Sequence, residues 1–265
     1  MKQSPKLLHL IINLEHSTER RALVERQAEQ WGLDLHFIKA IAGKDLDMDH
    51  LEGYDRERRM RAFTSDLLPN EHACVQSHLK AMREFMASDC DYCLISEDDV
   101  LYSDTFKSRL EFLLTRTSGW EFVKLFSGDC LRYAVLPGQQ GNPAVLEFPK
   151  KFPWGSVSNL YTRRAVEALL EGFKGYWMGF DVQAAQICLA AGIPCCGVTP
   201  DMADTSFRSN EVSEIDAEGA RRGGRRRPPR SLAQYMRHRL FVWSMARGKQ
   251  RMRSLLSRCL KVERD

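Results

Sequence analysis

The chain has 265 residues, of which 43% are hydrophobic and 28% are charged, and its formal net charge is +4. This composition is typical of a globular protein with a sizeable core. No apolar run approaches the ~20 residues that a membrane-spanning helix needs, which excludes an integral membrane protein built from such helices.

Alternating apolar strands and amphipathic helices are expected along the first 200 residues. The expected strands are residues 6–14, 35–38, 92–97, 120–126, 157–161 and 193–198, with a hairpin made of 131–136 and 144–148. The expected helices are residues 19–31, 56–63, 71–86, 103–115, 164–170 and 181–191, followed by two basic helices at 231–246 and 249–261. The order strand, helix, strand at the start predicts a parallel α/β sheet.

The run at residues 7–14 follows two lysines, as the apolar part of a signal peptide does. It contains His9 and Asn13, however, and no small-residue cleavage site follows it. We therefore expect a core strand there and a protein that acts in the cytoplasm. Cysteines such as Cys93 and Cys195 fall within apolar strands, which favours reduced, buried thiols over disulfides or a zinc site.

Charge is unevenly distributed along the chain. Residues 221–265 hold 15 Lys and Arg against 2 Asp and Glu, whereas residues 1–220 hold 24 against 33. We predict a domain over 1–220 and a basic amphipathic helical tail over 221–265. This asymmetry indicates binding to an anionic surface, either a membrane or a nucleic acid, and a solvated tail is the alternative.

Three consecutive carboxylates, Glu97, Asp98 and Asp99, follow the apolar run Tyr92–Ile95. Like charges this close are costly to hold together unless a cation lies among them, and oxygen ligands suit Mg²⁺ or Mn²⁺. Ligands of α/β sheets bind at such strand ends. Alternation along an extended chain predicts that Glu97 and Asp99 share one side and that Asp98 faces the other. The alternative is a solvated acidic turn that starts a helix near residue 103.

Several stretches together resemble the motifs of one enzyme family in order and spacing. They are Ile11–Leu14 with Glu19–Arg21, Ala40–Gly43, Glu71–Leu79, Ile95–Val100, and Gly155 with Ser158–Leu170. The family is glycosyltransferase family 25, the lipopolysaccharide-biosynthesis enzymes that include bacterial β-galactosyltransferases. The resemblance covers about residues 6–210, and it departs from the family pattern at Asn70, His72 and Ala73.

This resemblance implies a type-A glycosyltransferase fold, with a Rossmann-like, open, mostly parallel sheet and flanking helices. It also implies metal-dependent, inverting transfer of a hexose, namely galactose from UDP-galactose, to a lipopolysaccharide, a lipooligosaccharide or a related surface glycan. Asp99 and Glu97 would hold Mn²⁺ or Mg²⁺ against the leaving diphosphate. A divalent-metal phosphoester hydrolase could use the same carboxylates.

Other residues of these motifs are expected to bind the donor nucleotide sugar: Asn13, Leu14, Arg20, Arg21, Ala40, Ile41, Ser77, His78 and Asp98. Arg20 and Arg21 begin a helix, where guanidinium groups and free backbone amides can hold anionic oxygens. As alternatives, both arginines are solvated helix residues, and Ser77 and His78 are packed core residues.

An aromatic loop, Tyr176–Phe180, precedes Asp181. Aromatic faces pack on sugar rings, and a neighbouring carboxylate can take a proton from an acceptor hydroxyl. The predicted catalytic residues are therefore Asp181 and Glu97. Alternatively, Asp181 only caps its helix.

In the tail, Leu240 and Trp243 lie among arginines, as in an interfacial amphipathic helix on anionic lipid. We expect the protein at the inner face of the cytoplasmic membrane, beside a lipid-linked acceptor. A nucleic-acid partner is the less favoured alternative because no recognised binding motif accompanies the charge. Removing 221–265 is expected to release the protein from the membrane without loss of activity on a soluble acceptor.

Overall fold

The computed structural model describes residues 5–63, 65–115, 120–126, 132–135, 145–149, 155–205 and 231–261. Within them the strands are β1 (Leu7–Asn13), β2 (His36–Lys39), β3 (Tyr92–Glu97), β4 (Val100–Tyr102), β5 (Phe122–Lys124), β6 (Arg132–Val135), β7 (Val145–Pro149), β8 (Ser158–Thr162), β9 (Cys195–Thr199) and β10 (Ala203–Thr205). The α-helices are α1 (Thr18–Trp31), α2 (Arg56–Ala62), α3 (Pro69–Ala87), α4 (Phe106–Thr115), α5 (Arg163–Gly172), α6 (Phe180–Ala191) and α8 (Leu232–Lys261).

The described strands form one large sheet and a small one. The large sheet has the order β2-β1-β3-β8-β5-β9-β7-β6, and β4 pairs with β10 in a separate antiparallel ribbon. β1 is parallel to β2 and β3, and β5 is parallel to β9, whereas β8 and β7 run in the opposite direction. The predicted fold class, an open and mostly parallel α/β sheet, is confirmed.

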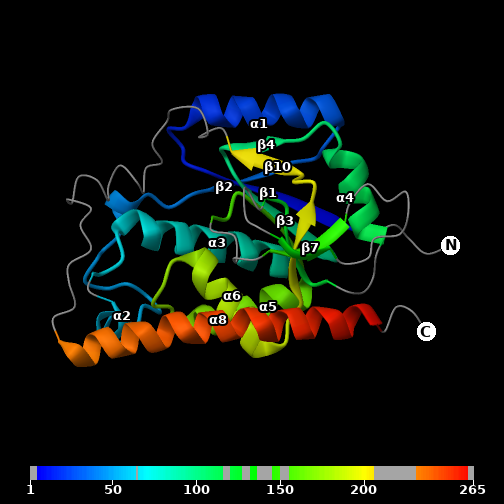
Figure 1. Cartoon of the computed structure of the whole chain (residues 1–265). Coiled ribbons are helices and arrows are strands. Elements are labelled where there is room, and N and C mark those ends of the chain that lie inside the picture. The colour runs from blue at the N-terminus through cyan, green and yellow to red at the C-terminus, as the bar shows by residue number, and fades with distance from the viewer. Residues whose placement is uncertain are drawn as a thin grey trace.

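Helices cover both faces of the large sheet (Figure 1). α1 and α4 lie on one face, and α3, α5 and α6 lie on the other. α8 forms the outermost element beneath α5 and α6, and it contacts α2, α6 and β9. None of the described helices combines the length and the apolar character that crossing a bilayer requires.

Local sequence explains where the first helices begin and end. Gly32 ends α1 in the left-handed region, at φ 59°, and its amide reaches the carbonyls of Ala28 and Glu29. The helix expected over residues 71–86 begins two residues earlier, so Asn70 lies inside its first turn and does not cap it. Pro69 occupies the first helical position, where its missing N–H costs nothing, and the Glu71 carboxylate accepts from the Leu68 amide at 2.7 Å.

α8 is one continuous helix, so the expected division into two helices near residue 248 is wrong. Gly248 does not end the helix, although glycine is a poor helix former. Its missing side chain allows close packing, because a Cβ at Gly248 would lie 2.8 Å from the Leu189 side chain. Burial of α8 against the body therefore outweighs the local preference of glycine. The expected division into a domain and a tail stays a prediction.

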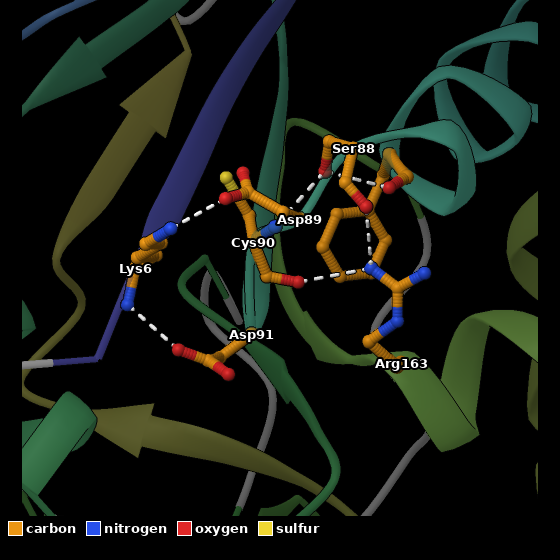
Figure 2. Close-up of polar contacts among 7 residues, drawn as sticks. Lys6, Ser88, Asp89, Cys90, Asp91 and Arg163 are labelled. Atoms are coloured by element: carbon orange, nitrogen blue, oxygen red, sulfur yellow. Dashed lines mark hydrogen bonds and ion pairs between the residues drawn. The ribbon is translucent and has the colours of Figure 1, made fainter.

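Arg163, at the start of α5, fixes the connection between α3 and β3 (Figure 2). Its guanidinium donates to the backbone carbonyls of Met86, Ser88 and Cys90 at 2.9, 3.2 and 3.0 Å. These carbonyls lie at and just beyond the end of α3, where a cation is favoured by the helix dipole. On the other side of the connection, Lys6 binds Asp89 and Asp91. β3 is thus held at its beginning by both β1 and α5.

Replacing Arg163 with alanine should therefore destabilise the protein. We expect a loss of about 1 to 3 kcal/mol, since three charge-assisted hydrogen bonds disappear and their carbonyls lie partly out of reach of water. The neighbouring exposed Arg164, which pairs with Glu121, provides a matched control with an expected loss below about 1 kcal/mol. Urea unfolding of both variants measures the difference. Equal losses would mean that the carbonyl contacts contribute nothing particular.

Candidate functional site

A hollow of about 160 Å³, open to solvent, lies at the carboxyl ends of β1 and β3. Its lining comes from β1, α1, the segment after β2, the first half of α3 and the turn after β3. The lining residues are Ile12, Leu14, Arg20, Ala40, Ile41, Ala42, Asn70, Ala73, Cys74, Ser77, His78, Glu97, Asp98 and Asp99. The hollow thus lies where parallel α/β sheets bind ligands.

The three carboxylates reach the hollow together because the chain turns between β3 and β4. Asp98 and Asp99 form the turn, so the alternation expected for an extended chain ends at Glu97. All three carboxylates line the hollow, which corrects the expected placement of Asp98 on the opposite side.

A buried network of side-chain hydrogen bonds lies next to this turn and supports it. The Tyr102 hydroxyl donates to Ser96 at 2.9 Å and lies 2.7 Å from His9 Nε2, and Ser96 lies 2.8 Å from the Ser158 hydroxyl. The network therefore joins β1, β3, β4 and β8 directly under the carboxylates. Burial lowers the pKa of His9 to about 3, so this imidazole is neutral at ordinary pH.

Asp98 is neutralised within the protein. One oxygen lies 3.0 Å from the Arg20 guanidinium, and the other accepts from the Asn13 amide at 2.7 Å. Arg20 also donates to the Ser17 hydroxyl at 2.8 Å, which fixes its position on the wall of the hollow. Burial is the largest influence on the pKa of Asp98 and raises it, against the lowering effect of Arg20 and Asn13. Both oxygens of Asp98 are thus engaged by protein groups.

Asp99 differs from Asp98 because one of its oxygens is left without a partner. Oδ2 accepts from the Thr205 hydroxyl of β10 at 2.7 Å, but Oδ1 is buried and has no hydrogen-bond partner among the described residues. Only 6% of the residue is exposed. Burial, and then the charge of Glu97, raise the pKa of Asp99 to about 7. A buried carboxylate in this state is costly unless a cation reaches it.

Glu97 lies between Asp99 and α3. One of its oxygens is 3.2 Å from His78 Nε2, and the His78 ring stacks on Phe180 with 4.1 Å between centroids. Cys74, one helical turn before His78, completes a group whose possible ligand atoms all lie within 4.8 Å of one another. Glu97 is therefore shared by two neighbouring groups, one of carboxylates and one with a thiol and an imidazole.

The residues present fit a divalent cation. Glu97 and Asp99 offer carboxylate oxygens, one of them buried and unpartnered, and hard oxygen donors suit Mg²⁺ and Mn²⁺. The group of Cys74, His78 and Glu97 would suit a softer ion better. Burial raises the pKa of Cys74 well above its usual range, which makes its thiol a poor ligand until an ion displaces the proton.

Most residues predicted to bind the donor are brought together. The Ser77 hydroxyl accepts from the Ile41 amide at 2.9 Å, so α3 fixes the backbone that carries Ala40 and Ile41 into the hollow. Leu14 and His78 line the same space, whereas Asn13 contributes through its bond to Asp98.

Two predicted residues are not brought to the hollow. Arg21 pairs with Glu25 at 2.8 Å, stacks over the Phe37 ring of the edge strand β2, and is not part of the lining. Asp181 is not part of the lining, and its carboxylate accepts from the amides of Gly155 and Val182 at 2.7 and 2.8 Å. Its charge still contributes to the raised pKa of Cys74 on the wall, so Asp181 lies within electrostatic reach of the hollow.

Sequence reasoning missed Cys74 and Thr205 in the site. Cys74 could have been found, because it precedes His78 by four residues on a predicted helix, and such residues share a face. Thr205 gave no signal, since it lies 106 residues from Asp99 along the chain. Of the two residues that support the turn, His9 lies within an apolar run that indicated only a core strand, and Tyr102 lies in β4, which the sequence did not predict.

The sequence model of one family, described as "Glycosyltransferase family 25 (LPS biosynthesis protein)", matches residues 7–151. This segment is more than half of the chain and contains β1, α3 and the carboxylate turn. The chain therefore belongs to glycosyltransferase family 25.

Curated relatives match part of the chain at modest identity. A glycosyltransferase 25 family member of Aedes aegypti is 29% identical over 124 residues, 43% of this chain and 20% of the relative. Procollagen galactosyltransferase 1-B of Xenopus laevis is 28% identical over 112 residues, 39% of this chain and 18% of the relative. A Rattus norvegicus relative, 28% identical over 127 residues (43% of this chain, 22% of the relative), is named a probable inactive family member. The matched part thus spans about a fifth of these relatives.

Among solved structures, a glycosyltransferase involved in glycosylation of the major capsid of PBCV-1 aligns with 62% of this chain and 62% of its own. The identity is 11% and the TM-score is 0.30. Agreement this low supports neither a shared fold nor a shared function, so the fold described above rests on the topology of the chain itself.

Proposed function

We propose that this chain transfers galactose from UDP-galactose to a hydroxyl group of a lipopolysaccharide or a related surface glycan, with inversion at the anomeric carbon. The observation that carries the proposal is the pair Glu97 and Asp99 at the edge of a hollow, with one buried Asp99 oxygen that no described protein group satisfies. The names of the procollagen galactosyltransferase relatives support galactose as the sugar. A lipid-linked acceptor would place the reaction at the cytoplasmic face of a membrane.

Glu97 and Asp99 would hold Mn²⁺ or Mg²⁺, which supplies, when bound, positive charge to the diphosphate that leaves with the nucleotide. Arg20 adds a fixed positive charge on the same wall, because Asp98 and Ser17 hold its guanidinium. The backbone at Ile41, fixed by Ser77, would position the nucleotide in the hollow. These residues provide orientation and charge, which are the main needs of a displacement at a sugar carbon.

The acceptor hydroxyl must lose a proton as its oxygen bonds to the anomeric carbon. We propose Asp181 as the group that takes this proton, with the amides of Gly155 and Val182 orienting its carboxylate. The electron pair of the broken bond to the sugar remains on the departing nucleotide diphosphate. Glu97 is one residue of the cation pair in this scheme and does not need to act as a base.

Ligand-dependent thermal stability tests the donor and the cation together. UDP-galactose at about 100 times its dissociation constant should add about 2.7 kcal/mol to the free energy of unfolding when Mn²⁺ is present. That corresponds to an increase of about 5 to 10 °C in Tm, and the increase should shrink when Mn²⁺ is removed with a chelator. Other nucleotide sugars should give smaller increases.

Glu97→Gln should abolish the Mn²⁺-dependent part of this increase, because the amide is a weaker ligand for the cation. The matched control is Glu25→Gln, on the exposed side of α1, which should keep it. Transfer to a glycan acceptor is then measured with the wild-type chain. Release of free galactose at the same rate with and without acceptor would assign the site to hydrolysis instead and contradict the proposal.

A further inference from the structure

The outer face of α8 exposes apolar side chains in a single stripe. Leu232, Met236, Leu240 and Trp243 follow one another at spacings of four, four and three residues, which places them on one side of the helix. They are 77%, 51%, 58% and 52% exposed. Outside α8, Met48 is the one large hydrophobic residue of the described chain that reaches comparable exposure, at 40%. The exposed large hydrophobic residues of the described chain are therefore concentrated on α8.

The opposite face of α8 already has its partners in the body of the protein. Gln234 donates to the carbonyls of Met60 and Phe63 at 3.2 and 2.8 Å, and the Phe241 ring packs against Phe63 and Trp177. Further along, Met252 is 2% exposed. The inner face of α8 thus already packs on the body of the protein. The stripe lies on the opposite face and does not contribute to the core.

The positive charge of α8 limits which kinds of partner surface can bind the stripe. From Leu232 to Lys261 the sequence has eight Lys and Arg and no Asp or Glu. Arg239 and Arg247 are exposed beside the stripe, and the Arg247 guanidinium lies 3.6 Å from the centroid of the Trp243 ring. A second copy of α8 packed face to face would bring these cations together, which is unfavourable. An anionic partner surface is favoured instead.

We propose that the outer face of α8 docks on an anionic phospholipid bilayer, with Leu232, Met236, Leu240 and Trp243 in the acyl boundary and the arginines at the phosphate groups. An apolar stripe flanked by cations, with an indole at its side, is the pattern of a helix that lies in the membrane interface. A nucleic acid would engage the arginines but would leave the aliphatic side chains without a function. A bilayer accounts for both.

This docking would hold the whole enzyme and not a loosely attached tail. Phe241 contacts Trp177 on the aromatic loop that leads to Asp181, so the helix and the acceptor side of the site belong to one packed body. With the proposed function, the arrangement would keep the acceptor side near lipid-linked glycans. The docking itself does not depend on that function, and its test needs no turnover.

The test is sedimentation of the full chain with vesicles of phosphatidylcholine alone or mixed with phosphatidylglycerol. We expect binding to the mixed vesicles that weakens with salt. The variant Leu232→Ser/Leu240→Ser/Trp243→Ser should bind them about tenfold or more weakly, since three exposed apolar side chains no longer enter the boundary. Arg239→Gln should weaken binding about fivefold. Met48→Ser is the control away from α8 and should bind like the wild type.

An unchanged Tm of the triple variant shows that its fold is intact. Undiminished binding of the triple variant to the mixed vesicles would overturn the proposal. Wild-type dimers that dissociate in the triple variant, with no vesicle binding by either, would assign the stripe to a second copy and overturn it as well. Binding of the wild type to duplex DNA or RNA, with no binding to vesicles, would also overturn the proposal.

Discussion

Replacing Asp99 with asparagine is expected to abolish transfer and, in the absence of a cation, to stabilise the protein. The substitution keeps the size of the side chain and its contact with the Thr205 hydroxyl, but it removes a negative charge that is 6% exposed and lies beside Glu97. Loss of activity with a gain of stability is typical of a residue kept for function at a cost in stability.

The gain should depend on pH in a defined direction. Burial and the charge of Glu97 raise the pKa of Asp99 from 3.8 to about 7 in the folded protein. Between these values the folded protein keeps a proton that the unfolded chain has released, so the free energy of unfolding of the wild type falls as pH rises through this window and levels off above pH 7. The asparagine side chain does not titrate, so the free energy of unfolding of Asp99→Asn should change less with pH in this window.

Above pH 7 the difference should be on the order of 2 to 4 kcal/mol in favour of Asp99→Asn, since each pH unit of a one-proton difference is worth about 1.4 kcal/mol. Urea unfolding in a chelator at pH 5 and pH 8 measures it. With Mn²⁺ added, the wild type should gain stability and the variant should not. If the variant is less stable than the wild type at pH 8, the negative charge of Asp99 does not destabilise the folded protein.

Met252→Ala is expected to destabilise the protein by about 2 to 5 kcal/mol, the usual loss for a long buried apolar side chain. Met252 lies in the second half of α8, is 2% exposed, and its sulfur accepts from the Cys195 amide of β9 at 3.5 Å. The matched control is Met236→Ala, the same substitution on the outer face of the same helix, where the residue is 51% exposed. It should cost less than about 0.5 kcal/mol.

Thermal and urea unfolding of both methionine variants tests whether α8 unfolds together with the rest of the protein or is a separable tail. A large loss for Met252→Ala alone means that α8 is part of the cooperative fold. Deleting residues 221–265 would then expose Trp177 and its neighbours and lower stability, contrary to the expectation that activity on a soluble acceptor would survive the deletion. Equal and small losses for both variants would support a separable tail.

The elements that sequence predicted well are those with a clear periodic pattern. β1 and β3 are runs of buried aliphatic residues, and α3 places Val75, Leu79 and Met82 on one buried face. β4 and β10 were missed because three residues carry no period, and their pairing joins segments about 100 residues apart. α8 was divided at Gly248 because the contact with Leu189, which compensates the glycine, is not visible in local sequence.

Within the site, sequence identified the carboxylates and did not predict their different states. Asp98 and Asp99 are adjacent and chemically identical, yet Asp98 pairs with Arg20 and accepts from Asn13, whereas one Asp99 oxygen is buried without a partner among the described residues. That difference arises from the turn after β3 and from β10, which only tertiary structure brings to Asp99. Arg21 shows the reverse case, since its helical position sends it outward to Glu25.

The reversed strand β8 brings the later part of the chain to the edge of the sheet that carries the carboxylates. β8 is antiparallel to β3 and β5, so β8 begins at the edge of the sheet where β3 and β5 end. At this edge the Glu97 amide donates to the Val157 carbonyl at 2.8 Å. Gly155, just before β8, is held by Asp181 and Lys124. The hollow is lined by residues between Ile12 and Asp99, whereas Gly155 and Asp181 come from the later part of the chain and lie outside its lining. Under the proposed function, substitutions around Gly155 can therefore change which acceptor is used, whereas Ser158 and Thr205, from the same later part, hold the carboxylate turn and have to be kept.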